Sequence, residues 1–150
     1  QTKARAEIRI HSMLSNHPNI VRFLGWNTDN EIMFLAMEYI DLSLHDLIPQ
    51  GDGLEDLLAI KKFAKQIASG LEFMHSMHIA HLDVKPMNVL VTTPGRDAKL
   101  CDFGVSQLLP KTVELRADFG TIYYQAPETR NGRMKGYSTK ADIWSLGCTI

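Results

Sequence analysis

Apolar side chains recur along this chain at spacings that separate helices from strands. Residues 2–14 set apolar residues among charged ones in the pattern of an amphipathic helix. Residues 54–77 carry the longest helical pattern, and we expect apolar residues to cover one side of that helix. These residues are Leu57, Leu58, Phe63, Ile67, Leu71 and Met74.

Shorter apolar runs predict strands. Residues 20–25 and 32–39 flank the turn-forming residues 27–30, so we expect them to pair. The stretches 89–91 and 99–100 flank Pro94-Gly95 and predict a hairpin. Residues 104–136 have no regular period and many turn formers. Irregular segments of that length inside a compact domain are usually functional.

Composition narrows the class of protein. With 45% hydrophobic residues, the 150-residue chain can build one domain core. The 16 basic and 17 acidic residues leave a net charge of −1 without a basic block, so we expect no nucleic-acid partner. No apolar run is long enough to cross a membrane, and no signal-peptide pattern is present. Cys101 and Cys148 fit no zinc or disulfide spacing, so a cytoplasmic location is expected, with the nucleus left open.

The ends of the chain lie inside predicted elements. Gln1 opens directly into a helical pattern, and Ile150 falls inside the apolar run 143–150. Domain boundaries are normally polar and flexible. We therefore expect the chain to be a fragment, inactive by itself.

Four short stretches carry the candidate chemistry: residues 81–88, 102–104, 126–128 and 142–147. Each is short enough to arise by chance, but their order and separations make a pattern. In the first stretch, a carboxylate, an ammonium and an amide fall within six residues on a predicted loop. A second carboxylate follows the next strand. These four residues are Asp83, Lys85, Asn88 and Asp102.

Phosphoryl transfer needs such a set, because the transferred group carries spread negative charge and needs metal ions and a cation. Asp83 can orient an attacking hydroxyl and accept its proton, and Lys85 can neutralise the moving phosphoryl group. Asn88 and Asp102 offer the hard oxygen ligands that Mg²⁺ prefers. The alternative is that Asp83 and Asp102 cap turns and Lys85 is a solvated surface charge.

The ordered set resembles the catalytic loop, the metal-binding triplet and the end of the activation segment of eukaryotic protein kinases. The resemblance implies an α+β, two-lobed protein kinase fold. Residues 1–40 would supply part of the N-lobe: the regulatory helix, two sheet strands and the hinge. Residues 41–150 would supply the first half of the mainly helical C-lobe, from the hinge-proximal helix to the start of the helix that carries Asp142.

The same resemblance implies roles for further residues. Glu7 lies where the family has its ion-pairing glutamate, and Thr121 would bridge Asp83 and Lys85 through its hydroxyl. Five residues are implied to line the ATP pocket, with Met37 as gatekeeper. They are Met37, Glu38, Ile40, Leu90 and Cys101.

Buried supports of the site follow from the resemblance as well. His81 and Phe103 match two members of the family's hydrophobic regulatory spine. His11 would be the third, with an ordinary helix-surface histidine as the alternative. Asp142 would accept hydrogen bonds from the catalytic-loop backbone, as a buried carboxylate requires. We expect Trp144 to pack in the core.

Smaller signals favour the Ser/Thr branch of the family. Lys85-Pro86 and Gly120-Thr121 resemble that branch, so the chain is expected to come from a kinase that transfers the ATP γ-phosphate to protein Ser/Thr with Mg²⁺. The alternative is a pseudokinase-type scaffold that binds partners without catalysis. Residues 81–83 and 43–48 further resemble Mos-like kinases.

Two departures from the family concern catalysis and regulation. The Gly-rich loop and the lysine that pairs with Glu7 are absent, and Lys3 cannot replace that lysine because it lies one turn earlier on the same helix. Leu82 replaces the arginine that normally binds an activation-segment phosphate, and residues 117–118 offer no hydroxyl. We therefore expect packing or a regulatory partner to order the segment, with neither Ser106 nor Thr112 as an obligatory switch.

The substrate preference is expected to be non-basic. Met87 stands where kinases that select arginine usually have glutamate. Val105 resembles the β-branched residues that accompany threonine acceptors.

Overall fold

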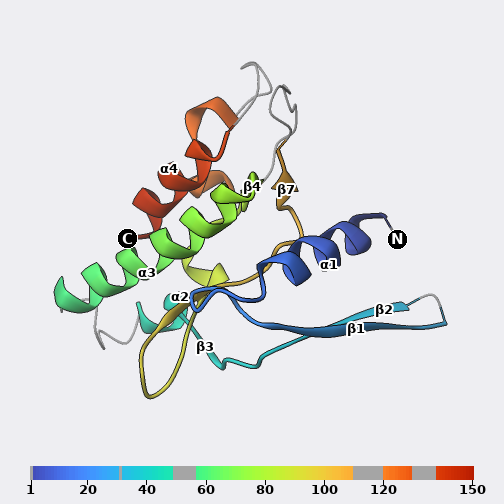
Figure 1. Ribbon diagram of the computed structural model, residues 1–150. Helices are drawn as coiled ribbons and strands as arrows, with labels where there is room; N and C mark the ends of the chain where they lie inside the picture. The colour runs from blue at the N-terminus through green and yellow to red at the C-terminus, as the bar shows by residue number, and fades with distance from the viewer. Residues whose placement is uncertain (1, 31, 49–56, 110–119, 130–137) are drawn as a thin grey trace.

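The computed structural model describes residues 2–30, 32–48, 57–109, 120–129 and 138–150. Helix α1 (Thr2–Leu14) lies beside a long hairpin of strands β1 (Phe23–Asp29) and β2 (Ile32–Met37), which extends away from the remaining elements (Figure 1). Helices α3 (Leu57–Ser76) and α4 (Lys140–Thr149) pack together on the other side of the molecule. Helices and sheets thus occupy separate stretches, and the predicted α+β class is confirmed.

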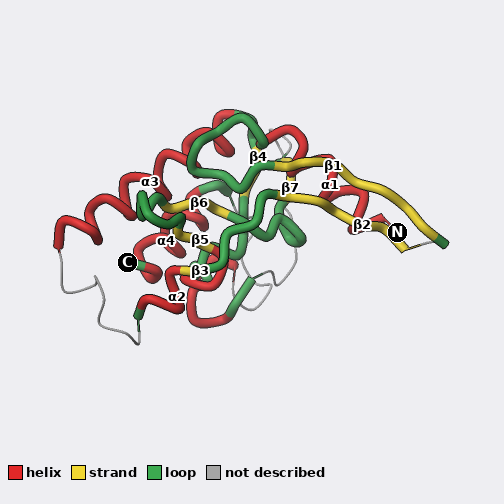
Figure 2. Tube along the Cα trace, turned by 90° about the horizontal axis from the view of Figure 1, so that it is seen from below, coloured by secondary structure: helices red, strands yellow, loops and turns green. Residues whose placement is uncertain are grey.

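Short strands connect the helices to the stretches that carry the candidate chemistry. Strands β3 (Leu42–Ser43), β5 (Val89–Val91) and β6 (Ala98–Leu100) form an antiparallel sheet in the order β3-β5-β6 (Figure 2). Strand β4 (Ile79–Ala80) pairs with β7 (Gln107–Leu108). The hairpin predicted around Pro94-Gly95 is therefore confirmed, and it begins its second strand one residue earlier than expected.

The remaining elements are single turns. Helix α2 (Leu44–Leu47) follows β3 directly, and Ser43 caps it: its hydroxyl accepts the Asp46 N–H while the Asp46 carboxylate accepts the Ser43 N–H. Three 3₁₀ turns cover Pro86–Asn88, Ile122–Tyr124 and Pro127–Thr129. None of the helices among the described residues is long and apolar enough to cross a membrane.

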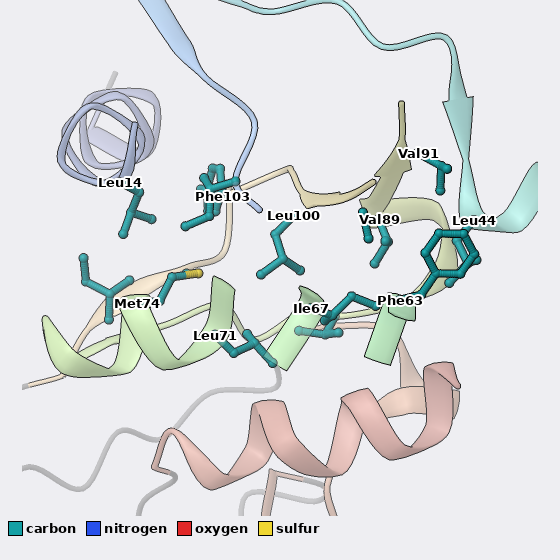
Figure 3. Close-up of a cluster of buried hydrophobic side chains, with 14 of the residues drawn as sticks. Leu14, Leu44, Phe63, Ile67, Leu71, Met74, Val89, Val91, Leu100 and Phe103 are labelled. Carbon is teal, nitrogen blue, oxygen red and sulfur yellow. The ribbon is translucent and has the colours of Figure 1, made fainter. Parts of the chain in front are cut away.

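One face of α3 forms the floor of the core. Its buried side chains recur at helical spacing and point toward Leu100 and Val89 of the small sheet (Figure 3). They are Phe63, Ile67, Leu71 and Met74. Gly70 lets the helix approach closely, since a Cβ there would meet the Asn19 carbonyl at 3.0 Å. The helix predicted over residues 54–77 is confirmed from Leu57 to Ser76, and Met77 lies in the turn that follows. Leu57 and Leu58, expected on the covered side, are exposed because they lie in the first turn, before the part of the helix that packs on the core.

The first predicted strand pair differs from the structure at its start. Ile20 and Val21 do not belong to the hairpin: Ile20 bridges to Leu100 in parallel, and the Val21 N–H donates to the Leu100 carbonyl at 2.9 Å. Both side chains are buried there. The ladder instead runs on to the pair Asp29–Ile32, through residues that the sequence marked as a turn. Ile20 and Val21 thus pair with β6, which is distant in sequence, and not with β2 of the hairpin.

Helix α4 turns an unusual face inward. Trp144, expected in the core, is 50% exposed, so that expectation is wrong. The buried residues of α4 are instead small or polar, namely Ala141, Asp142, Ser145 and Thr149. The polar ones are accommodated because each makes hydrogen bonds inside the molecule.

Candidate active site

A buried carboxylate on α4 fixes the loop that carries the candidate catalytic residues. Asp142 is fully buried, and its two oxygens accept the His81 N–H at 2.9 Å and the Leu82 N–H at 2.8 Å, as expected. The His75 imidazole on α3 adds a third contact at 2.8 Å. These partners offset the cost of burying the charge. They also hold Leu82 at a φ of 67°, a backbone conformation that leucine rarely adopts without such support.

Asp83 is the centre of the polar cluster. One oxygen, Oδ1, accepts the Thr121 hydroxyl and the Thr121 N–H, each at 2.9 Å. The other oxygen, Oδ2, accepts Lys85 Nζ at 2.7 Å and Asn88 Nδ2 at 2.9 Å. Lys85 Nζ also donates to the Thr121 hydroxyl at 2.8 Å, so the expected bridge is present. Asp83 is therefore not a turn cap, and Lys85 is not a solvated surface charge.

Thr121 reaches Asp83 because the preceding residue is a glycine. Gly120 has a φ of +83° and lies so close to the Leu82 carbonyl that a Cβ would collide with it. Only glycine adopts that conformation at no steric cost. The sequence order Gly120-Thr121 thus delivers both a hydroxyl and an N–H to one carboxylate oxygen, 38 residues away in the chain.

The candidate metal ligands lie on neighbouring segments. Asn88 directs its amide N–H groups to Asp83. Its backbone carbonyl accepts the Cys101 N–H at 3.0 Å, so Asp102, the residue after Cys101, follows directly on the neighbouring segment. The Asp102 side chain is exposed and one oxygen accepts the Gly104 N–H at 3.2 Å. An amide oxygen and a carboxylate are donors that suit Mg²⁺, so the residues present fit this ion.

Glu7 on α1 faces the same region. A Cβ on Gly104 would lie 3.6 Å from Glu7 Oε2 and 3.3 Å from Asp102 Oδ1, so the two carboxylates border one glycine. Burial, and then the negative charge of Asp102, raise the pKa of Glu7. The charged form of Glu7 is therefore disfavoured in this arrangement.

The expected ATP-pocket residues are linked through Lys99 of β6. Lys99 Nζ lies 2.6 Å from Glu38 Oε1, and in the sheet Lys99 stands opposite Leu90. Burial pushes the pKa of Glu38 up, but Lys99 and the Arg22 N–H outweigh it, so the pKa lies below its ordinary value. The segment with Met37 and Ile40 is thereby tied to the β5–β6 hairpin.

Cys101 is a protonated thiol at neutral pH. Burial, and then the Asp102 charge, raise its pKa to about 12. A thiol with that pKa is neither a nucleophile nor a metal ligand, because both roles require the thiolate. Its placement suits an apolar wall.

An aromatic column connects α1 to the loop that carries Asp83. The His11 ring lies 4.8 Å from Phe103, and Phe103 lies 5.4 Å from His81, measured between ring centroids. His11 is 1% exposed and its Nε2–H donates to the Val21 carbonyl at 2.7 Å, so the helix-surface alternative is wrong. Burial lowers the pKa of His11, with the Val21 carbonyl opposing.

Among the candidate regulatory hydroxyls, only Ser106 lies in the described part of the chain. It is buried, and its hydroxyl donates to the His81 carbonyl at 3.0 Å. Thr112, Ala117 and Asp118 lie outside the described residues.

Sequence reasoning missed three residues that support the site: His75, Lys99 and Gln125. Gln125 Nε2 donates to the Gly120 carbonyl at 3.2 Å, next to the Asp83–Thr121 contact. None of the three belongs to one of the short motifs, and each acts through a partner distant in sequence or in an irregular turn. No local pattern in the sequence predicts such contacts.

Comparisons with known proteins agree with this geometry. The family described as "Protein kinase domain" matches residues 1–150. Mitogen-activated protein kinase kinase kinase 15 of Mus musculus is 40% identical over 146 residues, covering 96% of this chain and 11% of the relative.

Two further relatives come from Physcomitrium patens and Homo sapiens. Mitogen-activated protein kinase kinase kinase 1b of Physcomitrium patens is 38% identical over 135 residues, covering 89% of this chain and 17% of its own length. Serine/threonine-protein kinase Nek5 of Homo sapiens is 38% identical over 139 residues, covering 89% of this chain and 19% of its own length. The chain thus spans less than a fifth of each of the three relatives.

Proposed function

Because this chain belongs to the protein kinase family, we propose that it forms part of the catalytic domain of a protein serine/threonine kinase that uses ATP and Mg²⁺. The observation that carries the proposal is the Asp83 carboxylate, held by Thr121, Lys85 and Asn88 within 2.7–2.9 Å. The alternative is a scaffold that binds partners without catalysis. The intact cluster argues against it.

Each residue has a role that follows from its position. Asp83 orients the substrate hydroxyl and accepts its proton, since its carboxylate remains 11% exposed while its orientation is fixed. Lys85, beside Asp83, offsets negative charge on the transferred group. Asn88 and Asp102 would hold Mg²⁺, which supplies charge neutralisation at the phosphates.

Around this cluster, the proposed nucleotide site extends to the hinge. Met37, Glu38, Ile40, Leu90 and Cys101 would surround the adenine, with Glu7 turned toward the phosphates' side. We propose a location inside the cell, since both cysteines are free in the structure. A protein substrate is the natural acceptor.

The test separates catalysis from binding in the complete protein. We expect Asp83→Asn to lower kcat by about 10²–10⁴-fold with little change in nucleotide affinity, the usual value of a positioned base. Asp102→Asn should instead weaken Mg²⁺-dependent nucleotide binding. Phosphorylation of a protein substrate and nucleotide titration measure the two effects.

The control is Asp97→Asn, on the β5–β6 turn, whose carboxylate contacts Gln66 and Lys62 rather than the cluster. It should leave both quantities unchanged. Near wild-type phosphorylation by both cluster variants would favour the scaffold.

A further inference from the structure

We propose that Gln125 is a positioning residue for Asp83 that acts through the peptide group between Gly120 and Thr121; this rests on the proposed kinase function. The carbonyl of that peptide accepts Gln125 Nε2 at 3.2 Å, and its N–H donates to Asp83 Oδ1 at 2.9 Å. Gln125 and Asp83 therefore hold opposite edges of one planar amide.

The Gln125 contact opposes rotation of the peptide plane between Gly120 and Thr121. Gly120, at a φ of +83°, has backbone freedom that other residues lack, so the following peptide plane is not fixed by sterics alone. If the plane rotated, a carbonyl oxygen would turn toward Asp83 in place of the N–H. The Gln125 amide holds the carbonyl on the far side and keeps the donor on Asp83.

The same contact strengthens the donor. Hydrogen bonds in series polarise one another, so a carbonyl that accepts a bond makes the N–H of its own amide a better donor. Thr121 N–H is one of two donors to Asp83 Oδ1, and it fixes the side of the carboxylate opposite Lys85 and Asn88. Losing it would leave the Thr121 hydroxyl to hold Oδ1, so the carboxylate would be less firmly oriented.

Gln125 is itself held by rigid parts of the fold. It ends the 3₁₀ turn Ile122–Tyr124, and its N–H donates to the Ile122 carbonyl at 3.4 Å. The preceding carbonyl, that of Tyr124, accepts the Ser145 hydroxyl of α4 at 2.7 Å. Its successor Ala126 is buried. Because the backbone is anchored on both sides of Gln125, its side chain starts from a fixed position and can hold a neighbour in a defined orientation.

The test uses Gln125→Met in the complete protein, which keeps the size of the side chain and removes the donor. We expect kcat to fall about fivefold, the equivalent of one ordinary hydrogen bond, with the KM for ATP unchanged. In an Asp83→Asn background the same change should have no further effect on kcat. Amide hydrogen exchange at Thr121 should become several-fold faster.

The matched control is Gln66→Met, since Gln66 also binds backbone and side-chain groups, at Ala98 and Asp97. It should lower Tm without changing kcat. Unchanged kcat in Gln125→Met, or an equal loss in the Asp83→Asn background, would overturn the proposal. If the wild-type protein phosphorylates nothing, the kinase function fails, and Thr121 exchange alone then decides whether Gln125 fixes the peptide.

Discussion

The His11 imidazole lies where an apolar side chain would fill the same space without any polar atom. Its Nδ1 is buried and has no hydrogen-bond partner among the described residues, while Nε2–H is used by the Val21 carbonyl. A proton added to Nδ1 would place a charge in that site. Three other titratable groups lie in this region. Glu7 is one turn from His11 on α1 and lies near Asp102, and His81 lies on the other side of Phe103 from His11. None of them makes a hydrogen bond with Nδ1.

The sign of the resulting pH dependence follows from the lowered pKa of His11. The unfolded chain binds the proton near the ordinary value of 6.5, and the folded chain binds it only at lower pH. Stability is thus fully present above about pH 6.5 and falls as the pH drops toward the folded value. We expect Tm to fall between about pH 7 and pH 5, and His11→Leu to reduce that fall, as measured by thermal melts.

The control for this prediction is His45→Gln, at an exposed histidine of α2. It should leave the pH dependence of Tm unchanged. Equal slopes in wild type and His11→Leu would contradict the assignment.

Cys101 makes a second prediction at the residue scale. With its pKa raised to about 12 from an ordinary 9.0, roughly a thousandfold less thiolate is present near pH 8 than for an unperturbed thiol. We expect iodoacetamide to modify exposed Cys148 while Cys101 reacts about a thousandfold more slowly than a model thiol, as followed by mass spectrometry. Rapid labelling of Cys101 in folded protein would contradict this.

At the scale of elements, strand β7 and the turn before it lock the start of the activation segment to the catalytic loop. Ser106 donates to the His81 carbonyl, and β7 pairs with β4 directly before that loop. This packing needs no phosphate. This packing is consistent with the presence of Leu82 in the loop, because a leucine side chain has no positive charge with which to bind a phosphate.

Phosphatase treatment of the active complete protein should therefore leave its activity unchanged, and Thr112→Ala should leave the activity unchanged as well. Ser106→Ala should instead lower stability by about 1–2 kcal/mol, because the buried His81 carbonyl loses its donor. Activity assays and thermal melts measure the two effects. A tenfold loss of activity on dephosphorylation, about 1.4 kcal/mol of barrier, would show that a phosphate orders the segment.

Elements also show what a sequence can foretell. The α3 face was predictable because one side of a helix packs against one sheet, which leaves a period in the sequence. The start of β1 was not, since Ile20 and Val21 suit a hairpin and β6 equally. Trp144 was misplaced because local hydrophobicity ignores that Asp142 and Ser145 find hydrogen-bond partners on the inner face of α4.

Within the candidate site, the chemistry of Asp83, Lys85 and Asn88 followed from residue type and spacing. The Thr121 bridge came only from resemblance, because no local rule joins residues 38 positions apart. His75, Lys99 and Gln125 could not be foreseen, since their partners are set by tertiary contacts. His11 left two readings open until its burial was known.

At the scale of the whole molecule, exposed apolar side chains gather in segments next to the catalytic cluster. Met87 follows Lys85 by two residues and is 59% exposed, while Ile122 and Tyr123 follow Thr121 and are 68% and 84% exposed. No carboxylate stands among these positions. Under the proposed function, we expect such a surface to favour apolar over basic residues in a bound peptide.

A peptide-library screen on the complete protein should therefore show no selection for arginine two or three residues before the acceptor, and threonine should be preferred to serine. Met87→Glu is the matched variant, because it adds one carboxylate at the same place and should introduce arginine selection. Strong arginine selection by the wild-type protein would contradict the expectation.

The Asp142 contacts make the arrangement of the candidate active site depend on when α4 folds against the rest of the chain. The carboxylate joins His75, His81 and Leu82 across separations of 67, 61 and 60 residues. Closing loops of this length is entropically costly, and such contacts form late. During synthesis, everything up to residue 141 can emerge without the group that holds the catalytic loop in place. Under the proposed function, we therefore expect the loop that carries Asp83 to reach its working arrangement only after α4 has docked.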